Sequence, residues 1–152
     1  MRELARDDAA AAARVCQAAI RGIPPGFHEP ALQEHWATIL DAARLRELMD
    51  EQTLVGAFEE DILLGIGSLD APKAELGLLY VDPAHGGQGI GRRLTEAVAE
   101  LARAAGLETL WIDASLNAVA AYQAFGFEDL GIVERTDPTG QAWRGHRMRM
   151  HL

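Results

Sequence analysis

Four glycines stand within six residues, directly between a strand-like run and a helical pattern. The apolar run ends at Val81, a Pro turn follows, and then come Gly86, Gly87, Gly89 and Gly91. Each glycine weakens a first helical turn by up to ~1 kcal/mol relative to Ala. A run of glycines at the start of a helix therefore needs a bound group that offsets this loss of stability. A helix N-terminus leaves main-chain N–H groups unpaired and carries partial positive charge, and glycines let an anion come close. The segment therefore predicts a phosphate or diphosphate site formed by the N–H groups from about Gly87 to Arg92.

Three kinds of phosphate-binding loop are candidates for this segment, and the first two are the Walker A loop and the dinucleotide loop. A Walker A loop requires G-x-x-x-x-G-K-[ST]. Gly86 and Gly91 have that spacing, but two arginines follow in place of Lys and Ser/Thr, so we exclude it. A dinucleotide loop requires G-x-G-x-x-G in a tight strand-to-helix turn. Gly89 and Gly91 supply the first two glycines, Leu94 stands in the third place, and the strand ends several residues too early, so this loop stays as an alternative.

Periodicity predicts a mixed α/β (α+β) domain around one central sheet, with residues 1–152 as a single domain. We expect a helix over 8–21 with Asp7 or Asp8 as its cap, and one or two helices over 32–49. Ser115 is expected to cap the helix over 115–125. The remaining expected elements are strands over 53–59, 62–70 and 74–81, a helix over 88–105, a strand over 107–113, a helix over 115–125, and strands over 127–134 and 142–152.

Composition excludes several classes of protein. The net charge of −9 disfavours binding to nucleic acid and is compatible with a cationic substrate such as an amine. Cys16 is the only cysteine, so no internal disulfide forms, and we expect it in the core. No apolar run approaches the ~20 residues of a membrane span, and the scattered histidines predict no metal site. We therefore expect a cytoplasmic protein that contacts no membrane.

Two sequence blocks resemble one known family. The stretch V-D-P-x-x-x-G-Q-G-I-G-x-x-L resembles the acetyl-CoA pyrophosphate loop of the GNAT superfamily of N-acetyltransferases, whose pattern is [RQ]-x-x-G-x-[GA]. Gly89 and Gly91 match its last two positions, while Gly86 stands where Arg or Gln is usual. The stretch SLNAVAAYQAFGFEDLG resembles the later pattern N-x-x-A-x-x-x-Y-x-x-x-G-F, with Ser115 in the place of Asn. The residues in register with this second pattern are Ala118, Tyr122, Gly126 and Phe127.

The resemblance implies a GNAT-like acyl-CoA N-acyltransferase fold, a mostly antiparallel central sheet with flanking helices. It also implies transfer of an acetyl group from acetyl-CoA to a primary amine of a small molecule or peptide. A non-catalytic acyl-CoA-binding or sensing module is the alternative, which the departure at Gly86 favours. In the family, the strand before the glycine loop separates from its neighbour. The implied cofactor-binding residues are Leu79, Tyr80, Val81, Gly86, Gly87, Gln88, Gly89, Ile90, Gly91, Arg92, Ser115 and Tyr122.

Two residues are the catalytic candidates. Tyr122 would donate a proton to the sulfur of coenzyme A, because a phenol with a reference pKa of ~10 is protonated at neutral pH. Glu75 would act as the general base, directly or through water, with Asp113 as a lesser candidate. The acceptor pocket would include Phe27, His28 and Trp36. In addition, Gly77 is consistent with a bulge or a close approach of another group to its strand. The apolar final strand could pair with another chain in a homodimer.

Overall fold

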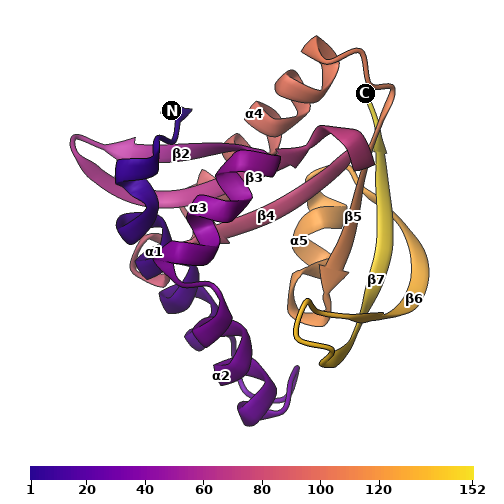
Figure 1. Ribbon diagram of the computed structural model, residues 1–152. Coiled ribbons are helices and arrows are strands. Elements are labelled where there is room, and N and C mark those ends of the chain that lie inside the picture. The colour runs from indigo at the N-terminus through magenta and orange to yellow at the C-terminus, as the bar shows by residue number, and fades with distance from the viewer.

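The computed structural model describes residues 1–152 and places seven strands in one sheet (Figure 1). Their order across the sheet is β1-β2-β3-β4-β5-β7-β6, and only β4 and β5 are parallel neighbours. This mostly antiparallel sheet with flanking helices confirms the predicted fold class. The strands are β1 (Arg2–Glu3), β2 (Thr53–Glu59), β3 (Ile62–Asp70), β4 (Glu75–Val81), β5 (Thr109–Ser115), β6 (Glu128–Thr136) and β7 (Ala142–His151).

Helices cover both faces of the sheet. The helices are α1 (Ala9–Arg21), α2 (Pro30–Ile39), α3 (Ala42–Glu51), α4 (Ile90–Ala104) and α5 (Val119–Ala124). Buried residues of α1 and α3 pack on β2 and β3 in one apolar cluster, whereas α4 and α5 pack on the opposite face in a larger one. Hydrophobic burial on two faces thus fixes the central strands between two layers of helices. None of the helices has the length and apolar character that crossing a membrane requires.

The glycines set the ends of α4. The helix begins at Ile90 and not at Gln88, because Gly89 adopts a left-handed conformation with φ of 77°. It ends at Ala104, and Gly106 follows with φ of 79°, as the sequence predicts for a glycine that terminates a helix. The first helical turn therefore begins directly at the glycine-rich segment.

Two expected helix caps are wrong. Ser115 is the last residue of β5 and its side chain caps no helix; a 3₁₀ turn over 116–118 follows before α5 begins at Val119. At the other end of the chain, the carboxylate of Asp8 accepts from the N–H of Ala5 at 2.8 Å and pairs with Arg2, so it does not cap α1. In both cases a 3₁₀ turn precedes the α-helix.

The expected role of the final strand in a homodimer is also wrong. Strand β7 lies between β5 and β6 and is hydrogen-bonded on both edges. It therefore has no free edge for another chain, because the β6–β7 hairpin folds back and inserts the last strand next to β5. The exposed edge of this half of the sheet belongs to β6, where the side chain of Ile132 is 64% exposed.

Candidate active site

A gap opens between the parallel strands β4 and β5. They pair at one register position, Glu75 with Trp111, and the N–H of Trp111 also donates to the carbonyl of Ala74 at 2.8 Å. Beyond this point the two strands diverge toward their carboxyl ends (Figure 1). The edge of β4 that faces β5 therefore keeps main-chain groups that no strand satisfies.

The alternation of β4 decides which residues present these groups. The N–H of Asp82 donates to Leu64 of β3 at 2.8 Å, so Tyr80, two residues earlier, also directs its main chain toward β3. The main-chain groups of Leu79 and Val81 consequently face the gap. The N–H and C=O of Tyr80, another of the implied cofactor-binding residues, belong to the β3 ladder, so its main chain does not face the gap.

A bulge in β4 lies beside the gap. Gly77 and Leu78 together stand opposite the single residue Ser68 of β3, which confirms the predicted bulge. A Cβ on Gly77 would collide with the amide oxygen of Gln52, which itself accepts from the hydroxyl of Ser68 at 2.7 Å. A side chain here would have to displace this amide. The extra residue bends the strand next to the place where it leaves β5.

Consecutive main-chain N–H groups lie free at the open end of the gap. The first intrahelical bond of α4 runs from Arg93 to the carbonyl of Gly89, so the N–H groups of residues 90–92 have no acceptor within the helix. The N–H groups of residues 87–89 have no protein acceptor either. Together with the helix dipole, this arrangement is suited to a diphosphate.

Two glycines hold this loop in conformations that other residues avoid. Gly87 and Gly89 have φ of 75° and 77°, and open space surrounds the position of a Cβ at each. Gly91 differs, because a Cβ there would lie 3.4 Å from the ring of Phe125, so its small size allows α4 to approach α5. Gly86 has φ of −62°, which any residue adopts. The backbone conformation therefore does not require a glycine at this position, where Arg or Gln is usual.

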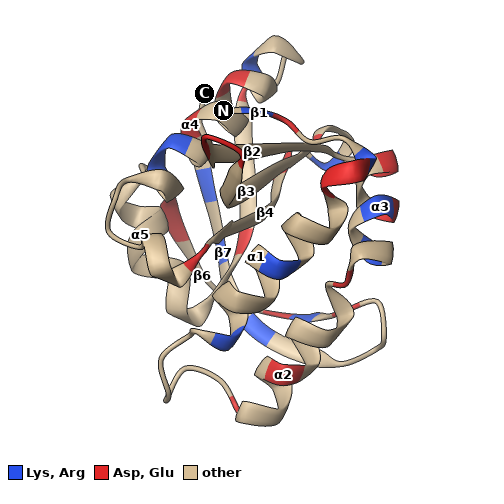
Figure 2. Ribbon diagram, turned by 90° about the vertical axis from the view of Figure 1, so that its left-hand side faces the viewer, with Lys and Arg blue, Asp and Glu red and all other residues tan.

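The side chain of Arg92 does not join the free N–H groups. Its guanidinium donates to the carbonyl of Ala124 at 3.0 Å and lies 5.3 Å from the ring centroid of Phe125. It therefore satisfies the carboxyl end of α5, where a cation is favourable. Helix α5 itself carries no charged residue (Figure 2). The main-chain N–H of Arg92 is its contribution to the loop.

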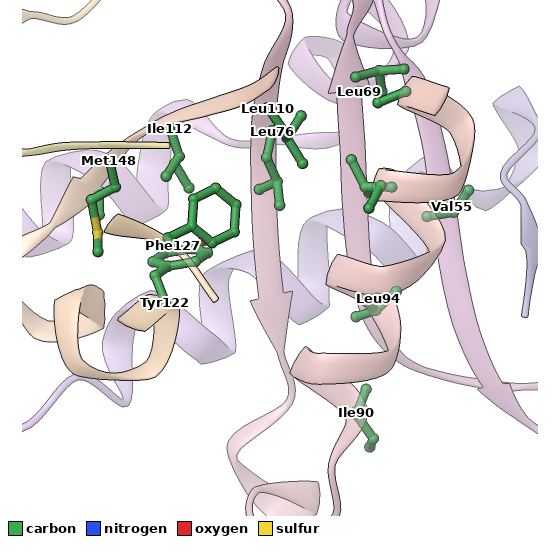
Figure 3. Close-up of a cluster of buried hydrophobic side chains, with 14 of the residues drawn as sticks. Val55, Leu69, Leu76, Ile90, Leu94, Leu110, Ile112, Tyr122, Phe127 and Met148 are labelled. Carbon is green, nitrogen blue, oxygen red and sulfur yellow. The ribbon is translucent and has the colours of Figure 1, made fainter. Parts of the chain in front are cut away.

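Tyr122 is buried on α5, with 5% of its surface exposed. Its ring lies edge-to-face against Phe125 and Phe127, with centroids 6.1 and 5.4 Å away, and Figure 3 shows it beside Phe127 beneath Ile112. Burial raises the pKa of Tyr122 well above its usual range, and the nearby phenol of Tyr80 raises it further. The hydroxyl has no protein partner and is not fully enclosed, so it can donate to a bound molecule.

Sequence reasoning missed the side chain of Tyr80. Burial raises its pKa, and the thiol of Cys16 on α1 raises it further. The phenol of Tyr80, on β4, is one cause of the raised pKa of Tyr122, on α5. The alternation of β4 is the signal that could have found this side chain, because it directs Tyr80 away from the α4 face and toward the α1 layer.

The two candidate carboxylates are held by arginines. Arg147 of β7 lies 3.1 Å from Glu75 and 3.1 Å from Asp113, and Arg135 lies 2.9 Å from Asp113. Glu75 is at the closed end of the gap, six residues before Val81, which is about 20 Å along an extended strand. Neither carboxylate is free to take a proton without weakening an ion pair.

Aromatic side chains gather near the end of β5. Trp36 of α2 contacts His28 and Trp143, with ring centroids 4.7 and 6.2 Å apart, and His28 bonds to Asn117 at 2.9 Å. The structure thus brings together two of the three predicted pocket residues, whereas Phe27 is exposed and joins no ring pair. Trp143 was missed because nothing local in its strand reveals that β7 pairs with β5.

Known proteins resemble this chain along most of its length. The model of the acetyltransferase (GNAT) domain family matches residues 11–150. An uncharacterized protein of Mycobacterium leprae is 33% identical in an alignment of 111 positions, which covers 66% of this chain and 30% of the relative. This chain therefore spans less than a third of that relative's length.

Solved structures share the fold. A GCN5-related N-acetyltransferase of Rhodopseudomonas palustris has a TM-score of 0.91 at 27% identity and covers 99% of this chain and 94% of its own. The PaiA N-acetyltransferase of Thermoplasma acidophilum, solved with coenzyme A, has a TM-score of 0.75 at 20% identity and covers 99% and 97%. Given this agreement and the family match over 140 of 152 residues, the chain belongs to the GNAT family of acetyltransferases.

Proposed function

We propose that this protein transfers the acetyl group of acetyl-CoA to a primary amine of a small molecule or peptide. The observation that carries the proposal is the run of free N–H groups over residues 87–92, which lies at the mouth of the gap where β4 and β5 separate. The family match supports acetyl-CoA as the donor. The net charge of −9 favours an acceptor that arrives as an ammonium ion.

The residues fit coenzyme A in two places. The N–H groups over 87–92 would hold its diphosphate, and the main-chain groups of Leu79 and Val81 would bind the pantetheine arm in the gap. The bound thioester supplies an activated acetyl carbon. A main-chain N–H of β4 that is directed at the thioester oxygen would stabilise the negative charge that develops there.

Tyr122 would donate the proton that the leaving sulfur needs. Its raised pKa keeps the phenol protonated at neutral pH, and its hydroxyl is unpartnered. The packing of Phe125 and Phe127 around the ring fixes the direction of the hydroxyl. Because Arg147 holds Glu75 in an ion pair, the proposal assigns no proton transfer to this glutamate.

Two measurements test this function. Acetyl-CoA and coenzyme A should raise the temperature of unfolding, while NAD and ATP should not. At a ligand concentration of 100 times Kd, the expected gain in the free energy of unfolding is about 2.7 kcal/mol. Release of the coenzyme A thiol should then depend on an added amine, from a panel of spermidine, kanamycin, phenylethylamine and an alanine-terminated peptide. Stabilisation without thiol release from any amine would favour the sensing module, and no stabilisation would overturn the proposal.

We further propose that residues 1–152 form a single domain. One sheet carries both hydrophobic clusters, and strands β2 and β3 contribute to each of them. Such shared strands couple the two layers of helices, so thermal unfolding should give one transition with equal calorimetric and van't Hoff enthalpies. Two separate transitions would contradict this organisation.

A further inference from the structure

The histidines of this protein differ in what holds them. His35 lies 2.9 Å from Asp137, His146 lies 2.9 Å from Asp129, and the ring of His85 is 4.0 Å from a carboxylate. His28 forms no ion pair and bonds instead to the neutral amide of Asn117 at 2.9 Å. A carboxylate stabilises the charged imidazolium, whereas an amide oxygen does not. Of these four histidines, His28 is the one whose hydrogen-bond partner is neutral, so no carboxylate holds it in an ion pair.

The bond to Asn117 also fixes the tautomer of His28. The partner atom is the amide oxygen Oδ1, which can only accept, so Nε2 of the ring carries the hydrogen. The other ring nitrogen, Nδ1, then holds a free lone pair. It has no partner in the protein and is not enclosed, because the buried side-chain nitrogen without a partner belongs to His85. An oriented imidazole with an accessible lone pair is the usual form of a general base.

The position of this pair places it beside the proposed site. His28 lies in the loop between α1 and α2, and Asn117 lies in the 3₁₀ turn that joins the end of β5 to α5. The same turn leads to Tyr122, five residues later on α5. The ring of Trp36 packs edge-on against His28 at 4.7 Å and restricts its rotation. His28 is thus held at the β5 side of the gap by a hydrogen bond and by an aromatic contact.

We propose that Nδ1 of His28 is the general base for the acceptor amine and that Asn117 is its positioning residue. This inference rests on the proposed acetyl transfer. An N–H bond of the ammonium breaks, its proton moves to Nδ1, and the nitrogen lone pair forms the C–N bond at the acetyl carbon. The C–S bond then breaks and the sulfur takes the proton of Tyr122. The second proton of the amine returns to Tyr122, and His28 releases its proton to solvent.

The surroundings of His28 support a pH-dependent test. Its two contacts, Asn117 and Trp36, do not titrate, and the adjacent charged residue along the chain is Glu29. A general base must be unprotonated to accept a proton. The kcat/KM of the wild-type protein, measured with acetyl-CoA and the best amine of the panel, should therefore fall as the pH is lowered, which gives the pH profile an acidic limb.

Three variants separate this role from a structural one. His28→Gln should lower kcat/KM by about 10²–10⁴-fold at neutral pH and remove the acidic limb, since general-base catalysis contributes that much. Asn117→Asp should move the limb to higher pH, because a carboxylate stabilises the imidazolium. Free imidazole should partly restore the rate of His28→Gly. His151→Gln, at the end of β7, is the matched control and should behave as wild type.

The outcomes distinguish the two proposals. If the wild-type protein turns over and His28→Gln keeps the same rate and the same acidic limb, the role of His28 is overturned. The acetyl transfer then remains intact. Stabilisation by coenzyme A serves as the folding control, because His28→Gln should retain it. Absence of turnover with every amine in the wild-type protein overturns the acetyl transfer and this inference with it.

Discussion

The hydroxyl of Tyr122 has no structural bond to lose, which makes its chemical role separable from its packing. Tyr122→Phe keeps the ring between Phe125 and Phe127, so the unfolding temperature should not change. We expect kcat to fall by about 10²–10⁴-fold with little change in the KM for acetyl-CoA, because the proton donor acts only in the transition state. Steady-state thiol release measures both. Tyr80→Phe is the comparison, with a smaller expected loss, and a wild-type kcat in Tyr122→Phe would contradict the assignment.

Cys16 should not react in the folded protein. It is fully buried, and burial raises the pKa of its thiol to about 12, so the reactive thiolate is absent at ordinary pH. A thiol reagent at pH 8 should modify the native chain only as fast as it unfolds, and should modify one thiol per chain rapidly in denaturant. Fast labelling of the native protein would contradict this burial. The expected result also means that thiol-release assays carry no background from the protein.

At this scale the sequence predicts best where a residue acts through local geometry. The glycine run marks the start of α4, and a Cys on an apolar helix face is expected to be buried. It predicts poorly where the partner is distant in the chain. Glu75 was expected to be a base, but its partner Arg147 lies 72 residues away, and no local pattern reveals that pairing.

At the scale of elements, the loop before α4 invites a direct test of its main-chain geometry. Gly89→Ala places a Cβ on a left-handed residue, which costs about 1–2 kcal/mol, and shifts the N–H groups of the first turn. We expect a lower unfolding temperature and a clear loss of coenzyme A affinity, measured by calorimetric titration.

The control for this substitution is Gly140→Ala. Gly140 has φ of 88° in the turn before β7 and also has open space around it, so its backbone strain is comparable. It should lose similar stability while retaining coenzyme A affinity. Equal affinities in the two variants would show that the loop before α4 does not hold the ligand.

The elements themselves were largely predictable, but two features were not. Hydrophobic spacing locates α4 and the strands β2 to β5 to within a few residues. The late start of α5 at Val119 was missed, because Ser115 pairs with Gly145 of β7 and continues the strand. The insertion of β7 between β5 and β6 was missed for the same reason, since pairing between strands depends on distant segments.

At the scale of the whole molecule, three paired carboxylates make stability depend on pH. A hydrogen bond from Arg2 lowers the pKa of Asp8, and one from the N–H of Gly131 lowers that of Asp129. Burial alone would raise the pKa of Asp137, but bonds from Thr139, Gln141 and His35 lower it overall. A carboxyl group whose pKa is lower in the folded protein than in the unfolded chain stabilises the fold at pH values above its unfolded pKa, which is about 3.9 for Asp. This stabilisation is lost as the pH falls through the pKa of the folded protein.

Asp137→Asn tests this dependence at the contact between the β6–β7 turn and α2. The carboxylate accepts from His35 on α2 and from donors within its own turn, and only 7% of its side chain is exposed. The variant should have a lower unfolding temperature at neutral pH, because an amide nitrogen cannot accept these bonds. As the pH falls below about 3.9, the unfolded value for Asp, and through the lowered folded pKa of Asp137, the difference from wild type should shrink.

Asp61→Asn, in the exposed turn between β2 and β3, supplies the matched control for that substitution. Asp61 makes no hydrogen bond or ion pair, so the loss of its charge should leave the unfolding temperature and its pH dependence as in wild type. A difference that belongs to Asp137 alone would show that the hairpin turn and α2 stabilise each other through this carboxylate.

Because Trp36 of α2 and Trp143 of β7 meet beside the same contact, loosening it should also raise the KM for the amine. An unchanged amine KM in Asp137→Asn would separate the acceptor site from this part of the fold.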